Sequence, residues 1–103
     1  MVLMELSVVP LGTGESVSPW VARCVDLIDR SGLDYELHAS GTIVEGSLEE
    51  VTSLLRQCIE AVASDCPRVT CLAKFDYKQG ETGRLKSNVD RVVAELGRAV
   101  RTG

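Results

Sequence analysis

The sequence predicts an α+β fold, in which a four-stranded antiparallel sheet carries two helices on one face and the chain ends in an additional helix. Three observations support this prediction. Apolar residues alternate with period two over residues 2–9, as in a strand. Residues 18–30 and 47–62 have apolar side chains at helical spacing. Short strand-like segments flank each helix, so the order strand-helix-strand occurs twice. Two such units that close one core form the ferredoxin-like β-α-β-β-α-β sandwich, with strand order 4-1-3-2.

Composition limits the class of protein. A chain of 103 residues is expected to form one domain over 1–103, with a core at 2–77 and a C-terminal helix at about 86–101. A net charge of −4 argues against nucleic-acid binding, which requires concentrated Lys and Arg. No apolar run reaches the ~18 residues of a membrane-spanning helix, and the N-terminus lacks the basic segment of a signal peptide. We therefore expect a cytoplasmic protein without nucleic-acid or membrane partners.

The cysteines and the single histidine do not suggest a metal site. Cys24, Cys58, Cys66 and Cys71 form no C-x-x-C pair, and His38 is far from all of them in sequence. Zinc sites and redox motifs normally have closer ligand spacing. We interpret the cysteines as buried thiols in a reducing cytosol. A disulfide between two of them is the alternative.

The first helix is expected after a glycine-containing loop at 10–15. We predict Ser18 as its N-cap and Pro19 in its first turn, where a missing N–H costs nothing. Its apolar stripe comprises Val21, Cys24, Val25 and Ile28. The pair at 31–32, Ser-Gly, ends the helix because glycine tolerates left-handed geometry. The alternating segment 35–40 then predicts the second strand.

A second unit of the same order follows Gly41. The β-branched segment 42–45 predicts the third strand. Ser47 and Glu50 form a capping box at the start of the second helix. The apolar stripe of this helix comprises Val51, Leu54, Leu55, Cys58, Ile59 and Val62. The alternating segment 68–77 predicts the fourth strand.

A third amphipathic helix is predicted after a polar connection at 78–84, with Ser87 as its N-cap. Its apolar residues are Val89, Val92, Val93, Leu96 and Val100. Two helices already cover one sheet face, so this one must cover the sheet edge, the other face or a partner subunit. Soluble monomers rarely leave a large apolar patch open. The open face would present Leu3, Val9, Ile43 and Leu72. We therefore expect a homo-oligomer whose sheets meet across a two-fold axis.

Polar side chains are also expected on the open face, in the phase opposite to Met4 and Leu6. The first strand contributes Glu5 and Ser7. The other strands contribute Glu36, His38, Ser40, Glu45, Thr70, Lys74 and Asp76. The fourth strand borders the first in the predicted order, so Lys74 can pair with Glu5. Such a set is either a polar network that determines the register of an oligomer or a cavity between subunits that holds a ligand.

Three segments resemble the small thiamine-binding protein family, which was formerly a domain of unknown function. They are ELSVVPLGTG at 5–14, SGLDYEL at 31–37 and GTIVEG at 41–46. The similarity runs in order over residues 2 to about 77. It implies a ferredoxin-like fold, a tetramer made of dimers, and binding of thiamine or its hydroxymethylpyrimidine half without catalysis. The sequence departs from the family pattern at Ala39-Ser40 and at 76–78, near the expected pocket.

The expected ligand-binding residues are Glu5, Ser7, Thr42 and Glu45, with Lys74 as the charge partner. A carboxylate can accept a hydrogen bond from the exocyclic amino group or a protonated ring nitrogen of an aminopyrimidine, while a hydroxyl can donate or accept. Strict alternation turns Thr42 toward the core unless Gly41 kinks the strand.

Two other classes of function are alternatives to ligand binding. One is an oligomeric regulatory or scaffold module whose interface contains a buried polar network and no ligand. The other is an enzyme, which would need a base and a nucleophile within ~3 Å of each other. The sequence does not indicate such a pair, so we expect no catalysis and no required cofactor.

Overall fold

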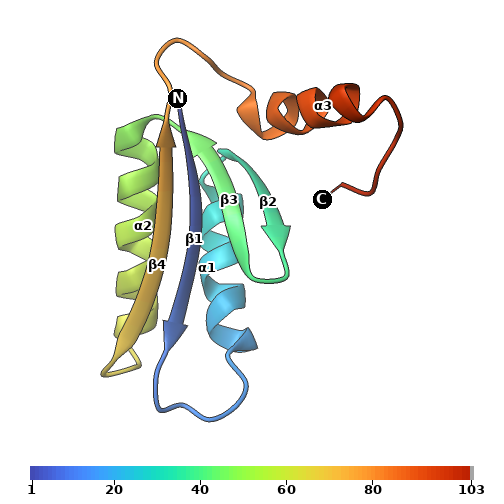
Figure 1. The fold of residues 1–103 in the computed structure, drawn as a ribbon. Coiled ribbons are helices and arrows are strands. Elements are labelled where there is room, and N and C mark those ends of the chain that lie inside the picture. Colours follow the sequence, from blue (N-terminus) through green and yellow to red (C-terminus); the bar gives the residue numbers. More distant parts are fainter. Residues whose placement is uncertain (103) are drawn as a thin grey trace.

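The structure, a computed structural model, describes residues 1–102. Its elements are β1 (Val2–Pro10), α1 (Ser18–Arg30), β2 (Asp34–His38), β3 (Gly41–Gly46), α2 (Leu48–Ala63), β4 (Val69–Tyr77) and α3 (Arg84–Leu96). The four strands form one sheet in the order β2-β3-β1-β4, and each neighbouring pair is antiparallel. This is the predicted ferredoxin-like arrangement, and Figure 1 shows α1 and α2 together on one side of the sheet.

The core lies between this sheet face and the two helices, and β1 is its central strand. Val2, Met4, Leu6 and Val8 alternate along β1 and are all buried. The predicted apolar stripe of α2 packs on them through Val51, Leu54, Cys58 and Val62. The opposite phase of β1 faces away from both helices. The period-two prediction for this strand is therefore confirmed.

The predicted N-cap residue is confirmed only for α2. The Glu50 N–H donates to Ser47 Oγ at 3.1 Å, and the Ser47 N–H donates to Glu50 Oε1 at 2.8 Å, so the capping box is confirmed. The prediction of Ser18 as the N-cap of α1 is wrong. The N-cap is Val17, because its carbonyl accepts the first backbone bonds of the helix, and Ser18 is already helical.

The predictions for the third helix need two corrections. It begins at Arg84 after Gly83, which has left-handed geometry (φ 70°), and Ser87 lies inside the helix with its N–H bonded to the Gly83 carbonyl at 3.0 Å. It ends at Leu96, before the predicted boundary near 101, because Gly97 adopts φ 73° and terminates the backbone ladder. Val100 therefore belongs to the C-terminal tail.

The third helix stands apart from the rest of the fold. Figure 1 shows α3 beyond one end of the sheet, and its contacts with the sheet are mainly with β3. A compact chain of this length has a radius of gyration of about 13 Å. The observed value is 15.0 Å. The helix thus extends the molecule instead of closing its core.

The thiols agree with the predicted burial for three of the four cysteines. Cys24, Cys58 and Cys66 are buried, Cys71 is half-buried, and all four are free. Where α1 crosses α2, Cys24 Sγ lies 3.8 Å from the Cys58 carbonyl oxygen, and Cys58 Sγ lies 3.9 Å from that of Cys24. Hydrogen bonding with the Cys24 thiol, together with burial, raises the pKa of Cys58. Separately, no helix among residues 1–102 combines the length and apolarity needed to cross a bilayer.

Candidate functional site

The open sheet face brings together Glu5 and Lys74, two of the predicted ligand-binding residues. Glu5 on β1 lies opposite Lys74 on β4 and opposite Ile43 on β3. Opposite charges at directly paired positions of neighbouring strands attract each other. The predicted proximity of Glu5 and Lys74 is confirmed, and both side chains are exposed in the single chain.

A hollow of about 320 Å³ lies over this part of the sheet. Its polar lining comprises Glu5, Ser7, His38, Ser40 and Lys74. These residues come from β1, from β4, from the end of β2 (His38) and from the turn after it (Ser40), so distant parts of the chain meet here. Leu72 adds an apolar wall that is 78% exposed.

Gly41 forms the floor of the hollow. A Cβ added to this residue would lie 3.0 Å from the Leu6 carbonyl oxygen and 4.0 Å from Glu5 Cγ. Real Cβ atoms rarely approach backbone that closely, so a side chain here would displace β1 or fill the space beside Glu5. The third strand was predicted over residues 42–45, after Gly41. Gly41 is instead the first residue of β3 and pairs with His38.

His38 is a polar residue of the hollow that our selection of ligand-binding residues omitted. Its Nε2 atom is buried and lies 3.5 Å from Glu36 Oε2, without hydrogen-bond geometry to any group in residues 1–102. In the single chain this ring nitrogen is therefore covered and lies beside the Glu36 carboxylate. The signal for it was present in the sequence, because period two from Glu36 places His38 on the open face.

Thr42 lies on the opposite face from the hollow. It pairs with Leu6, is 4% exposed and faces the helix-covered core. Gly41 continues the ladder without a kink, so the strict alternation of β3 is kept. Thr42 therefore does not line the hollow with Glu5, although it lines a separate cavity of about 200 Å³ together with Ser7, and its role in ligand binding stays a prediction.

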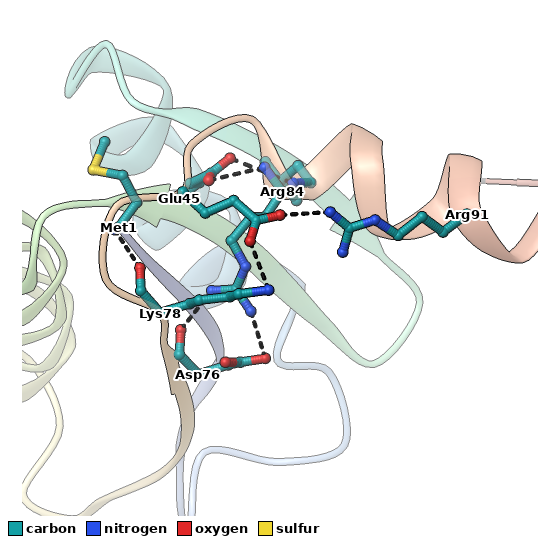
Figure 2. A network of polar contacts seen from close by, with 8 residues as sticks. Met1, Glu45, Asp76, Lys78, Arg84 and Arg91 are labelled. Atoms are coloured by element: carbon teal, nitrogen blue, oxygen red, sulfur yellow. Dashed lines mark hydrogen bonds and ion pairs between the residues drawn. The ribbon is translucent and has the colours of Figure 1, made fainter.

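Glu45 is on the open face but outside the hollow. Its carboxylate is buried and accepts the backbone N–H of Arg84 at 3.0 Å and that of Leu85 at 3.3 Å (Figure 2). These are the first N–H groups of α3, which normally need a capping acceptor. Gly83 has no side chain to supply one, and a carboxylate is also favoured by the helix dipole. Glu45, a residue of β3, therefore caps the N-terminus of α3.

Arg84 completes the joint between the sheet and α3. Its Nη1 donates to the Asp76 carbonyl oxygen at 3.0 Å, and its Nη2 lies 2.8 Å from Asp76 Oδ2. The side chain is 5% exposed, and its Nε has no partner among the described residues. Figure 2 shows this pair beside the Glu45 contacts. One turn of α3 is thus bound to both β3 and β4.

Glu81 adds a second set of ion pairs at the same joint. It lies 2.6 Å from Lys78 Nζ and 2.7 Å from Arg91 Nη2. The hydrogen bond from Lys78, and then that from Arg91, lower the pKa of the Glu81 carboxyl to about 2. The Met1 ammonium donates to the Lys78 carbonyl at 3.0 Å. Charged groups therefore concentrate where α3 leaves the sheet.

The hollow offers hydrogen bonding and charge. Within residues 1–102, no three His, Cys, Asp or Glu side chains come together as metal ligands. A carboxylate, two hydroxyls, an imidazole and an ammonium surround an apolar edge. Such a set suits a small flat heterocycle that carries both donors and acceptors.

Comparison with known proteins gives consistent matches over most of the chain. A UPF0045 protein of Synechocystis sp. is 43% identical over 92 residues, which cover 88% of this chain and 76% of that protein. A UPF0045 protein of Mycobacterium tuberculosis is 36% identical, covering 88% of this chain and 90% of the relative.

Solved structures show the same fold. A hypothetical protein from Methanocaldococcus jannaschii matches with a TM-score of 0.77 at 28% identity, covering 95% of this chain and 97% of that one. A structure from Thermotoga maritima, described as a candidate thiamine biosynthesis/salvage protein, matches with a TM-score of 0.74 at 26% identity, covering 87% and 98%. The sequence model of the family described as thiamine-binding protein matches residues 4–93. This chain therefore belongs to the thiamine-binding protein family.

Proposed function

We propose that this protein binds thiamine or its hydroxymethylpyrimidine half, without catalysis, in the hollow on the open sheet face. The observation that carries the proposal is the cluster of Glu5, Ser7 and Lys74 around the bare floor at Gly41. Membership of the thiamine-binding protein family supports the class of ligand. The description of the Thermotoga maritima protein points in the same direction.

The chemistry of an aminopyrimidine matches the groups in the hollow. Its exocyclic amino group can donate to the Glu5 carboxylate, and its ring nitrogens can accept from Ser7, from Ser40 or from His38. The absence of a Cβ at Gly41 leaves room for a flat ring against the sheet. Lys74 balances the charge of Glu5. In this proposal, Thr42 and Glu45 support the strand and α3 and do not contact the ligand.

A second copy of the chain completes the pocket in this proposal. Small-molecule sites bury 70–90% or more of a ligand's surface, whereas Glu5 and Lys74 are exposed in the single chain. Leu72 is 78% exposed beside them. A homo-oligomer, a dimer or a tetramer made of dimers, would cover both the apolar wall and the ligand. No other cofactor is needed, and the proposed location is the cytoplasm.

Calorimetric titration tests the proposal. We expect heat with thiamine, with hydroxymethylpyrimidine or with both, and at least tenfold weaker binding in Glu5→Gln, since a hydrogen bond to a charged group contributes about 1.5–3 kcal/mol. Glu49→Gln, an exposed acid on α2, is the matched control and should bind like the wild type. No heat with either ligand at millimolar concentration would overturn the proposal.

One observation favours a second candidate, an oligomeric regulatory or scaffold module without a ligand. The polar joint formed by Glu45, Arg84 and Asp76 shows that charged groups of the open face can serve structure alone. If the hollow has the same role, Glu5→Gln should change the assembly or the melting temperature and leave no ligand effect to lose. The titration above and sedimentation of the same variant separate the two candidates.

A further inference from the structure

Two thiols face each other where α1 crosses α2, on the helix-covered side of the sheet. The Sγ atom of Cys24 lies 3.8 Å from the Cys58 carbonyl oxygen, and that of Cys58 lies 3.9 Å from the Cys24 carbonyl oxygen. The two thiols also hydrogen-bond with each other. They are 34 residues apart in the sequence, so the packing of the two helices alone brings them together.

A cavity of about 200 Å³ gives access to the first of these thiols. Cys24 lines it, together with residues of β1, of α1 and of the turn after β2. Ser7, Ser40 and Thr42 contribute hydroxyl groups to its lining. A water molecule occupies about 30 Å³ in the liquid, so a small polar molecule has both room and hydrogen-bond partners here. Cys58 is 0% exposed, so a small reagent that enters the cavity meets Cys24 first.

The surroundings of the two thiols change their pKa values in opposite directions. The hydrogen bond with Cys58 lowers the pKa of Cys24, and the positive charge of Arg23 acts in the same direction, against the effect of burial. The same hydrogen bond, together with burial, raises the pKa of Cys58. The thiolate is the reactive form of cysteine. Cys24 is therefore favoured as the attacking thiol, and Cys58 stays its neutral neighbour.

The other two cysteines are less well placed to react with Cys24. Cys66 is buried after the end of α2, and Cys71 is half-buried on β4. Among residues 1–102, the thiols that form hydrogen bonds are those of Cys24 and Cys58. The structure thus presents one pair of thiols in contact and two separate ones.

We propose that Cys24 and Cys58 form an oxidation site for small hydroperoxides, in which Cys24 reacts first and Cys58 then closes a disulfide between α1 and α2. The site lies on the sheet face opposite the hollow, and the inference does not depend on the proposed function.

The reaction has two steps, written here for hydrogen peroxide. The Cys24 thiolate attacks one peroxide oxygen and the O–O bond breaks, so that Cys24 becomes a sulfenic acid and the second oxygen leaves as water with the proton of the Cys24 thiol. Cys58 Sγ then attacks Cys24 Sγ, the S–O bond breaks, and the hydroxyl leaves as water with the proton of the Cys58 thiol. Two thiols lose two electrons and two protons in total, and the peroxide is reduced to two waters.

Peptide mass spectrometry of Cys66→Ala gives the first test. Trypsin places Cys24 in the peptide 24–30 and Cys58 in 57–68, which also contains Cys66 in the wild type. The native variant is treated with a small excess of hydrogen peroxide and then alkylated in urea. We expect the two peptides to be joined, at a mass about 2 Da below their sum, with Cys71 alkylated. Free thiols throughout, a sulfinic acid without a cross-link, or Cys24 joined to Cys71 overturns the inference.

The wild type provides the same test without any substitution. Cleavage after Glu60 separates Cys58 from Cys66, so the partner of Cys24 can be identified directly. The cross-link should again join Cys24 to Cys58, and a thiol reductant should restore all four free thiols. A cross-link to Cys66 overturns the inference.

Two alanine variants test the order of the two steps. In Cys58→Ala, Cys24 should accumulate as a sulfenic acid that dimedone, added with the urea, converts to a stable adduct. In Cys24→Ala, Cys58 should stay a free thiol, because it is closed off from the cavity. Cys66→Ala is the matched control, since Cys66 is 3% exposed and the substitution is the same; it should cross-link like the wild type. A sulfenic acid on Cys58 in Cys24→Ala overturns the assigned order.

Oxidation of the unfolded chain shows whether the fold builds the site. In urea, peroxide should give a mixture of cysteine pairs, because no two thiols are held together. The native protein should form the Cys24–Cys58 cross-link roughly tenfold faster or more, since the packed helices hold the two thiols at a high effective concentration. The same rate and the same mixture in both states overturns the inference.

Discussion

Replacing Glu45 by Gln should loosen α3 without unfolding the sheet. The Glu45 carboxylate accepts two backbone N–H groups at the start of the helix, those of Arg84 and Leu85. A hydrogen bond to a charged group contributes about 1.5–3 kcal/mol, and an amide keeps one oxygen acceptor while turning an NH₂ toward donors. We therefore expect the free energy of α3 opening to fall by about 2 kcal/mol, which corresponds to a roughly 30-fold larger open population.

Hydrogen exchange measured by mass spectrometry on a peptide over 85–96 is the assay, at one fixed protein concentration. Exchange in this peptide should become about 30-fold faster, while peptides from β1 and α2 keep their rates, because α3 contacts the sheet mainly at β3. Glu49→Gln, an exposed acid in the first turn of α2, is the control. Unchanged exchange in α3, or an equal acceleration in every peptide, would refute the capping role of Glu45.

Three further predictions concern other parts of the molecule. Gly41→Ala brings a Cβ to 3.0 Å from the Leu6 carbonyl oxygen, so urea denaturation should show a free energy of unfolding lower by about 1–3 kcal/mol. Calorimetry should show weaker ligand binding by this variant. Wild-type values in both measurements would contradict the role of Gly41 as the floor of the hollow. The pKa of Glu81 is lowered from 4.5 to about 2, so this carboxylate contributes stability above pH 4.5 that is lost as the pH falls toward 2. Between pH 4.5 and 2, the melting temperature should therefore fall less in Glu81→Gln than in the wild type. The same fall in melting temperature for both proteins would be inconsistent with the ion pairs. Burial raises the pKa of Cys71, and the other three thiols are buried. A chromogenic disulfide reagent should therefore react slowly with at most one thiol of the native protein and with all four in urea. Rapid reaction of two or more thiols in the native protein would disagree with the fold.

Periodicity predicted the layers of this protein well. Alternation along β1 identified which side chains face the helices, and the Ser47–Glu50 box marked the start of α2. Both signals are local, since a side chain's direction in a strand follows from its position parity and a capping box involves residues three apart. The same parity placed Glu5 beside Lys74 once the strand order was known.

The errors arose where a partner lay far away in the sequence. Ser87 was predicted to cap α3 because a local hydroxyl is the usual acceptor, whereas the acceptor is Glu45, about 40 residues earlier. That long-range contact is not encoded in local spacing. For Thr42, by contrast, strict alternation along the strand was sufficient, because the pairing of Gly41 with His38 keeps the strand regular and Thr42 faces the core.

Local spacing of apolar and capping residues was therefore sufficient for the element order and the phase of the open face, because these depend on near neighbours in the sequence. The sheet topology followed from the requirement that two strand-helix-strand units close one core. The hollow beside Gly41, the place of His38 in its lining and the projection of α3 depend on how the strands come together in space. A single chain leaves that helix and that face uncovered, since a domain can bury its apolar stripes only against surfaces that its own topology brings within reach.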